Sequence, residues 1–188
     1  MPLKVSYKSD TIDVVNNGHT IQEIVHAQSS VKYDGREYHL VQFHFHSLSE
    51  HTINGKYRDL EMHLVHKDDR EHLLVGGVFF QKGKKNGQLE PIIRHLPDKP
   101  GKHKMDVMAQ VDVSSLVPKD SALFSYQGSL TTPPATEGLR WFVYPKPLSI
   151  SEAQLKKFRA LYDHNYRPVQ PLNGRMLGLV RQRAKGSK

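Results

Sequence analysis

Two short runs of alternating residue types carry the side chains best suited to chemistry. Residues 42–46 read Gln-Phe-His-Phe-His, and residues 61–66 read Glu-Met-His-Leu-Val-His. Because successive side chains of a β-strand point to opposite faces, the amide and both imidazoles of the first run share one face, and its two phenylalanines share the other. In the second run Glu61, His63 and Val65 fall on one face. Both runs therefore predict strands with an imidazole on one face.

The Asn54-Gly55 pair between these runs predicts a tight turn. Asn-Gly is the strongest short-range signal of a two-residue hairpin, since both central positions need a positive φ. An unbroken ladder from this turn would place His46 directly opposite His63, with Cβ atoms roughly 5 Å apart and His44 diagonally beside them. A bulge within residues 47–50 would change that register.

Three imidazoles that converge in this way would suit a catalytic zinc ion, which takes three protein ligands and a water. Metal-bound imidazoles usually donate their second N–H to an acceptor, and Gln42 and Glu61 each lie two residues before a histidine on the same face. A single strand histidine is more often a hydrogen-bonded core residue. Gln42 and Glu61 could equally be solvent-facing polar residues.

The composition indicates a soluble protein with one core. The chain has 188 residues, with 27 Lys and Arg against 19 Asp and Glu. This charge is dispersed, which argues against nucleic acid as a partner, and only residues 181–188 form a basic run, expected to be a flexible tail. Without cysteine, any metal must be held by histidines and carboxylates.

The sequence shows no signal-peptide pattern and no apolar run of membrane-spanning length. We therefore expect no membrane span and a cytoplasmic location. The alternative is a periplasmic or secreted protein from which a leader has been removed.

Short runs rich in Val, Ile, Tyr and Phe recur between turn signals and predict a mainly β protein. They are residues 4–7, 12–16, 20–26, 31–33, 39–46, 60–66, 73–81, 105–113, 123–127 and 139–145. Helical spacing is confined to residues 149–161, with Ser149 or Ser151 as N-cap, and to a shorter helix within 87–96. We expect a single domain over residues 1–188, with a large, twisted, mostly antiparallel central sheet and short peripheral helices.

Residues 42–46, 49–52 (Ser-Glu-His-Thr) and 61–66 together resemble the signature of the α-class carbonic anhydrases. The resemblance continues in order through residues 16–19, 126–134, 137–141 and 165–172, and so spans Val14 to Arg175. It implies the fold of that family and one Zn²⁺ per chain. It also implies reversible hydration of CO2 to bicarbonate and a proton by zinc hydroxide, weak ester hydrolysis, and inhibition by sulfonamides or anions at the zinc.

The resemblance also assigns roles to individual residues. Zinc would be bound by His44, His46 and His63. Thr131 would accept a hydrogen bond from zinc hydroxide and donate its own proton to Glu50, which orients the hydroxide. The substrate positions implied for CO2 and bicarbonate are Val65, Val75, Leu130, Thr132, Leu139 and Trp141.

Further roles concern orientation and proton transfer. The resemblance implies that the backbone carbonyl of Asn165 orients His46. It implies that His19 carries the proton to buffer along a water path lined by Asn17 and Gln22, as suits a group that titrates near neutral pH. His19 could also be an ordinary loop histidine. The remaining histidines are interpreted as structural or surface residues, and Arg167 as a structural anchor.

Two departures from the family pattern stand out. Only 18 residues precede His19, whereas family members usually begin several tens of residues earlier, so a partner chain could cover an exposed sheet edge in a homodimer. Ala135 replaces one half of a disulfide that is common in secreted bacterial relatives. Two other readings remain: a non-catalytic carbonic-anhydrase-like binding protein that keeps the fold and zinc, and a histidine-rich metal storage module.

Overall fold

The structure is a computed structural model that describes residues 1–119 and 121–184. Every run for which the sequence predicts a strand overlaps one of the first ten strands. The strands are β1 (Leu3–Ser6), β2 (Ser9–Asn16), β3 (Ile21–Ile24), β4 (Ser30–Tyr33), β5 (Arg36–His46), β6 (Leu60–Lys67), β7 (Leu73–Lys82), β8 (His103–Asp112), β9 (Ala122–Ser129), β10 (Glu137–Ile150) and β11 (Gly178–Ala184).

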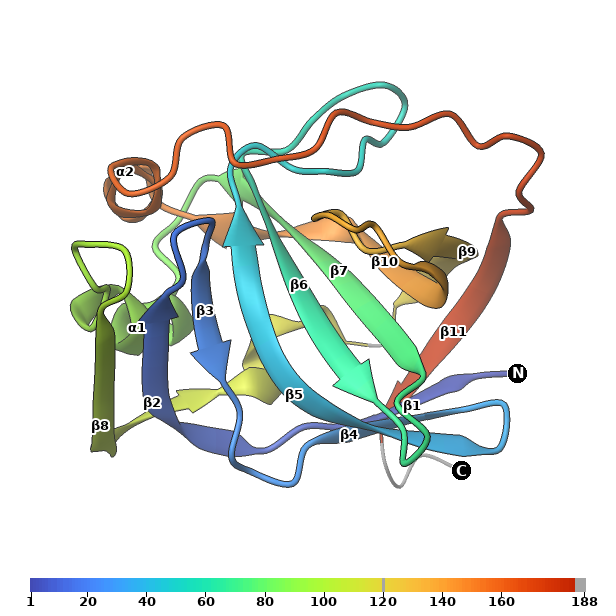
Figure 1. Ribbon diagram of the computed structural model, residues 1–188, viewed down its shortest axis with the longest axis horizontal. Helices are drawn as coiled ribbons and strands as arrows, with labels where there is room; N and C mark the ends of the chain where they lie inside the picture. Colours follow the sequence, from blue (N-terminus) through green and yellow to red (C-terminus); the bar gives the residue numbers. More distant parts are fainter. Residues whose placement is uncertain (120, 185–188) are drawn as a thin grey trace.

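The strands of the described residues form one eleven-stranded sheet in the order β4-β1-β11-β9-β10-β7-β6-β5-β3-β2-β8. The pairs β1–β11 and β7–β10 are parallel, and the other pairs are antiparallel. Because β4 also pairs with the first half of β5, the sheet curls back on itself, as Figure 1 shows. The prediction of a large, mostly antiparallel sheet is confirmed.

The register of the β5–β6 hairpin differs from the prediction. His44, and not His46, lies opposite His63, while His46 lies opposite Glu61. The predicted turn is present, with positive φ at Asn54 and Gly55, but residues 47–52 on one side of it are matched only by 57–60 on the other. The extra residues shift the ladder by an even number, so every side chain stays on its predicted face.

The C-terminal strand corrects a second expectation. Residues 181–184, predicted to begin a flexible tail, are the end of β11, which pairs with β9 and β1. Val180 and Gln182 are buried while Arg181 and Arg183 are exposed, so the strand alternation was present but was hidden by the basic residues. Residues 185–188 lie outside the described residues.

The short helices lie beside the sheet in Figure 1. α2 (Glu152–Arg159) begins at the N-cap Ser151, which forms a capping box with Gln154, and it buries Leu155 and Phe158 against the sheet. The predicted helix within residues 87–96 is a 3-10 turn, η1 (Gly87–Leu89), followed by α1 (Glu90–Arg94). A further 3-10 turn, η2 (Val113–Leu116), follows β8.

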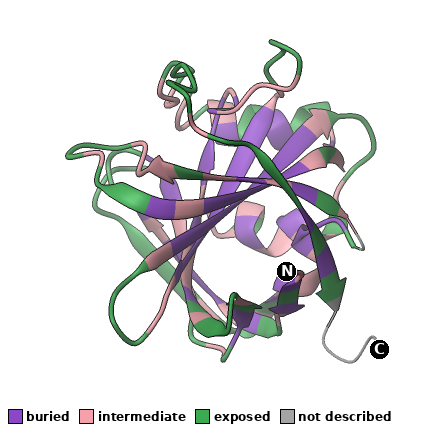
Figure 2. Cartoon of the chain, turned by 90° about the vertical axis from the view of Figure 1, so that its right-hand side faces the viewer, coloured by how far each residue is buried: buried purple, intermediate pink, exposed green. Residues whose placement is uncertain are grey.

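Buried residues lie mainly along the strands, and most residues of the connecting loops are exposed, although the edge strand β8 is largely exposed as well (Figure 2). Phe43, Phe45, Met62 and Leu64 belong to the main hydrophobic core, which leaves the opposite face of the hairpin to the histidines. Within residues 1–119 and 121–184, no helix is long and apolar enough to cross a membrane.

Candidate metal centre

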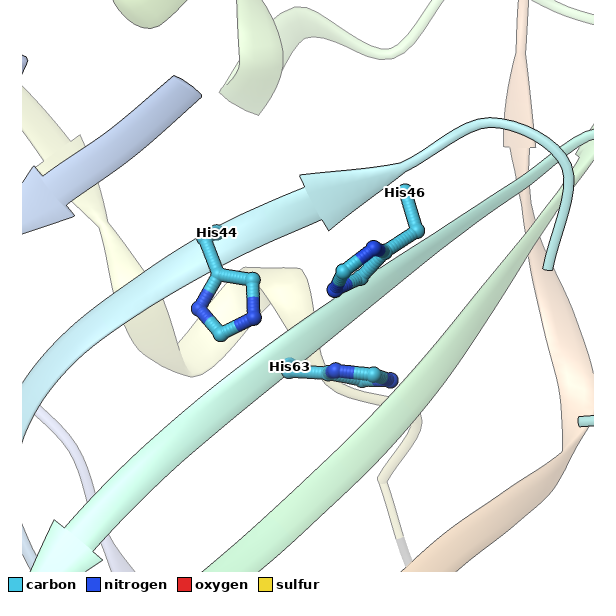
Figure 3. A group of neighbouring side chains, drawn as sticks. All are labelled: His44, His46 and His63. Carbon is cyan, nitrogen blue, oxygen red and sulfur yellow. The ribbon is translucent and has the colours of Figure 1, made fainter. Parts of the chain in front are cut away.

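His44, His46 and His63 converge at the open face of the β5–β6 hairpin (Figure 3). Their ring centroids are 5.0 Å apart for His44 and His46, 5.3 Å for His44 and His63, and 4.6 Å for His46 and His63. One ring nitrogen from each lies within 4.8 Å of the others. The structure therefore brings together all three residues that the sequence assigned to zinc.

The Nδ1 atoms of the two β5 histidines are held by oriented acceptors. His44 Nδ1 lies 2.8 Å from Gln42 Oε1, and His46 Nδ1 lies 2.8 Å from the backbone carbonyl oxygen of Asn165. With Nδ1–H donating in each case, the lone pair of each ring is on Nε2. Gln42 and Asn165 thus occupy the positions that the sequence assigned to them.

His63 is held by the opposite nitrogen, because its Nε2 lies 3.0 Å from Glu61 Oε1. Glu61 also accepts hydrogen bonds from the backbone N–H groups of Glu50 and His51, at 2.8 and 2.9 Å. Gly77 on β7 makes room for this carboxylate, since a Cβ there would lie 2.8 Å from Glu61 Oε1. The lone pair of His63 is consequently on Nδ1.

His51 was not predicted to take part in the site. Its Nδ1 lies 2.6 Å from Glu61 Oε1, and its Nε2 lies 2.5 Å from the Tyr126 hydroxyl. Burial alone would raise the pKa of Glu61, but the charges and hydrogen bonds of His51 and His63 outweigh it and hold that pKa well below its usual range. His51 follows β5 in an irregular loop, where strand parity gives no signal.

The imidazoles on β5 are kept neutral. Burial, followed by the charges of the neighbouring imidazoles, lowers the pKa of His44 well below its ordinary value and also lowers that of His46. His46 Nε2 is buried and has no hydrogen-bond partner. A buried ring nitrogen that has no hydrogen-bond partner, and that lies close to a ring nitrogen of each of two other histidines, fits Zn²⁺, which binds imidazole nitrogen in such sites.

Glu50 lies beside this centre, with Oε2 3.8 Å from His63 Nδ1. Its Oε1 accepts a hydrogen bond of 2.7 Å from the backbone N–H of Arg167, while Oε2 is buried without a partner. In the described part of the chain no hydrogen bond joins Thr131 to Glu50, so this oxygen remains free for a hydroxyl donor. The role of Arg167 rests on a backbone group, which no sequence pattern could reveal.

The predicted apolar substrate residues form a separate cluster beside the histidines. Val65, Val75, Leu139 and Trp141 are buried in it, and Leu130 packs against it partly buried. The Trp141 ring lies 4.8 Å from the His63 ring, measured between centroids. Two further members, Phe79 and Val143, were missed, although each lies an even number of residues from a predicted member on the same strand.

The loop residues around this centre are more open. Thr132 is exposed, and Thr131, Glu50 and Trp141 border a cleft of about 770 Å³. The backbone of exposed His19 is linked to the centre through Asn165, whose Nδ2 donates to the His19 carbonyl oxygen at 3.0 Å and whose own carbonyl oxygen holds His46.

Asn17 and Gln22 lie on the same side of the site. The Asn17 amide is 3.5 Å from Gln22 Oε1, and Gln22 pairs with His44 across β3 and β5. The three residues of the predicted proton path are therefore neighbours at this edge.

Comparison with known proteins agrees with this geometry. The family model for eukaryotic-type carbonic anhydrases matches residues 1–180. A carbonic anhydrase of Neisseria gonorrhoeae is 44% identical over 177 residues, which are 93% of this chain and 69% of the relative. One of Klebsiella pneumoniae is 40% identical over 179 residues, 94% of this chain and 72% of the relative.

The α-carbonic anhydrase of Thermovibrio ammonificans, solved in complex with the inhibitor sulfanilamide, superimposes with a TM-score of 0.89 at 44% identity. The match covers 97% of this chain and 79% of that structure. Three converging histidines, an adjacent apolar cluster and these matches lead to one conclusion: the chain belongs to the α-carbonic anhydrase family.

Proposed function

We propose that this protein catalyses the reversible hydration of CO2 to bicarbonate and a proton, with one Zn²⁺ per chain held by His44, His46 and His63. The observation that carries the proposal is that the three ring nitrogens left free by Gln42, Asn165 and Glu61 converge within 4.8 Å of one another. Zinc, when bound there, would supply a water of lowered pKa, the chemistry for which carbonic anhydrase is the standard example.

The chain's own residues would orient and confine the reactants. Thr131 would donate its hydroxyl proton to the free Oε2 of Glu50, which leaves the threonine oxygen to accept a hydrogen bond from the attacking group. The arrangement is supported by the bond from the Arg167 backbone N–H, which fixes the other carboxylate oxygen.

CO2 would lie against the apolar cluster of Val65, Val75, Leu130, Leu139 and Trp141. Thr132, exposed at the same rim, would border the bicarbonate position. A dry apolar wall suits an uncharged substrate and offers little to the charged product, which favours its release.

The proton would leave on the side of the site where His19, Asn17 and Gln22 lie. His19, exposed and next to Asn17, would accept it from water and pass it to buffer, while Gln22 and Asn17 order the water between. Asn165 supports this assignment, because it bonds both the His19 carbonyl and the His46 ring.

Stopped-flow CO2 hydration, measured together with the metal content of the same sample, tests the proposal. We expect one zinc per chain and rapid hydration that sulfanilamide inhibits. Protein with one zinc per chain and no hydration would instead be a non-catalytic binding protein with the same fold. Several zinc ions per chain and no hydration would favour metal storage.

A further inference from the structure

A second group of histidines and carboxylates lies on the β3-β2-β8 side of the sheet. Asp13 on β2 contacts two imidazoles at once: its Oδ2 lies 2.6 Å from His26 Nε2, and its Oδ1 contacts His103 Nε2. The Asp13 side chain is 5% exposed, whereas those of His26 and His103 are 48% and 49% exposed. One buried carboxylate therefore anchors two imidazoles that face solvent.

The backbone around this group is held in place. Asp10 Oδ2 accepts hydrogen bonds from the backbone N–H groups of His26 and Ala27, at 2.7 and 3.0 Å, which fixes the loop that carries His26. His103 is the first residue of β8 and pairs with Val15 on β2. The two imidazoles thus project from elements that are tied to β2 independently of Asp13.

A buried carboxylate without a complete set of partners lies beside Asp13. Glu23 is 0% exposed, its Oε1 accepts the Asp13 backbone N–H at 2.8 Å, and its Oε2 has no hydrogen-bond partner. Burial, together with the charges of Asp13 and Asp10, raises the pKa of Glu23 to about 8. Lys104, which follows His103 in the sequence, donates away from the group to the Leu96 carbonyl oxygen.

We propose that Asp13, His26 and His103 form a binding site for a second divalent transition-metal ion, with Glu23 as a further carboxylate. Two imidazole nitrogens and carboxylate oxygens are a ligand set that suits Ni²⁺, Cu²⁺ and Zn²⁺. The ion would replace the protons now shared between Asp13 and the imidazoles, together with the proton that a pKa of about 8 leaves on Glu23 at neutral pH, and it would neutralise the buried negative charge of Asp13.

Binding requires a small movement of the imidazoles. The ligand atoms of this group do not yet all lie within 4.8 Å of one another, as those of the three-histidine centre do. Metal–nitrogen distances of about 2.1 Å bring two ligand nitrogens to within about 4.2 Å of each other. The His26 and His103 side chains are half exposed, which leaves both imidazoles room to rotate toward a shared ion.

The test titrates the zinc-loaded protein with Ni²⁺ by calorimetry, with nickel and zinc counted in the same sample. We expect one Ni²⁺ per chain beyond the zinc, with a dissociation constant of roughly 10 μM, and a rise of roughly 5 °C in Tm at saturation. The double variant His26→Ala/His103→Ala should bind Ni²⁺ at least about 100-fold more weakly while its zinc content and CO2 hydration stay unchanged.

A matched double variant, His72→Ala/His95→Ala, removes two histidines that each contact one aspartate, Asp68 and Asp106 respectively, and should bind Ni²⁺ as the parent does. Glu23→Gln keeps the acceptor for the Asp13 N–H, removes the carboxyl that would lose its proton when the ion binds, and should weaken binding about tenfold. No nickel beyond the zinc in the parent protein, or equal binding in the His26→Ala/His103→Ala variant, would overturn the proposal.

Discussion

The two histidine groups of this sheet differ in what their ring nitrogens contact. In the three-histidine centre one ring nitrogen of each imidazole is hydrogen-bonded to an acceptor outside the group, namely Gln42, the Asn165 carbonyl or Glu61. The other ring nitrogen of each stays free. In the second group the Nε2 atoms of His26 and His103 are both hydrogen-bonded to Asp13, which is itself a member of the group. The first arrangement is therefore ready for a metal, while the second must exchange protons for one.

Burial follows the same division. The His46 and His63 side chains are 3% and 2% exposed, against 48% and 49% for His26 and His103. Rings that are packed and hydrogen-bonded cannot rotate, so the ligands of the first site are already ordered when the protein has folded, and binding a metal orders them no further. The comparison teaches that outside acceptors and burial, more than the number of histidines, make a site preorganised.

Removing one imidazole from each group gives the largest contrast. His63→Ala should abolish both zinc retention and CO2 hydration, because two ligands rarely hold zinc in a catalytic site. His26→Ala should leave both unchanged. Metal analysis and stopped-flow hydration on the two purified variants check this expectation, and full hydration by zinc-free His63→Ala protein would refute the assignment of the centre.

His66 is a buried imidazole outside both histidine groups, and it shows what burial does to the pKa of an imidazole. His66 is 0% exposed, and its Nε2 lies 2.8 Å from the Tyr7 hydroxyl while its Nδ1 lies 3.1 Å from the Leu74 carbonyl. Burial lowers its pKa to about 4. Between that value and its ordinary 6.5 the unfolded chain binds a proton that the folded chain does not.

The contribution of His66 to the free energy of unfolding should therefore be fully present above pH 6.5. It should fall as the pH drops toward 4, by about 3 kcal/mol in total. Urea unfolding at a series of pH values should show this loss in the parent protein and a flatter profile in His66→Gln. Tyr7→Phe, which leaves the imidazole buried, should keep most of the loss. Identical profiles for the parent and His66→Gln would mean that other groups cause it.

The acceptors themselves can be tested next. Gln42→Ala removes the partner of His44 Nδ1 but no zinc ligand, and should weaken zinc binding about 10- to 100-fold. Competition with a chelator measures the affinity, and Gln110→Ala, at an exposed glutamine of β8, is the matched control. Unchanged affinity in Gln42→Ala would show that packing alone orients His44.

These residues also show how far the sequence can be read. Strand parity predicted the faces of Gln42, His44 and Glu61 because a period of two survives the even shift caused by residues 47–52, but it could not predict which histidines lie opposite each other.

Strand parity within one hairpin could not predict contacts between residues of elements that lie far apart in the sequence. Asp13, His26 and His103 share no spacing, and the contact of Glu50 with Arg167 uses a backbone N–H. Such contacts depend on how loops cross the sheet, and loop paths carry no periodic signal.

The smallest effect concerns His19, which combines features of both groups: it is exposed like His26 but is tied by its backbone to Asn165, next to His46. If it passes protons to buffer, His19→Ala should lower turnover in dilute buffer by at least about tenfold, and added imidazole should restore it, because a diffusing base replaces the missing one. Hydration at high buffer concentration should barely change, since buffer then takes the proton directly. His39→Ala, at an exposed histidine near the start of β5, is the control and should match the parent throughout. Turnover of His19→Ala equal to the parent in dilute buffer would mean that protons leave by another route, and exposure next to the centre would then be insufficient for a shuttle.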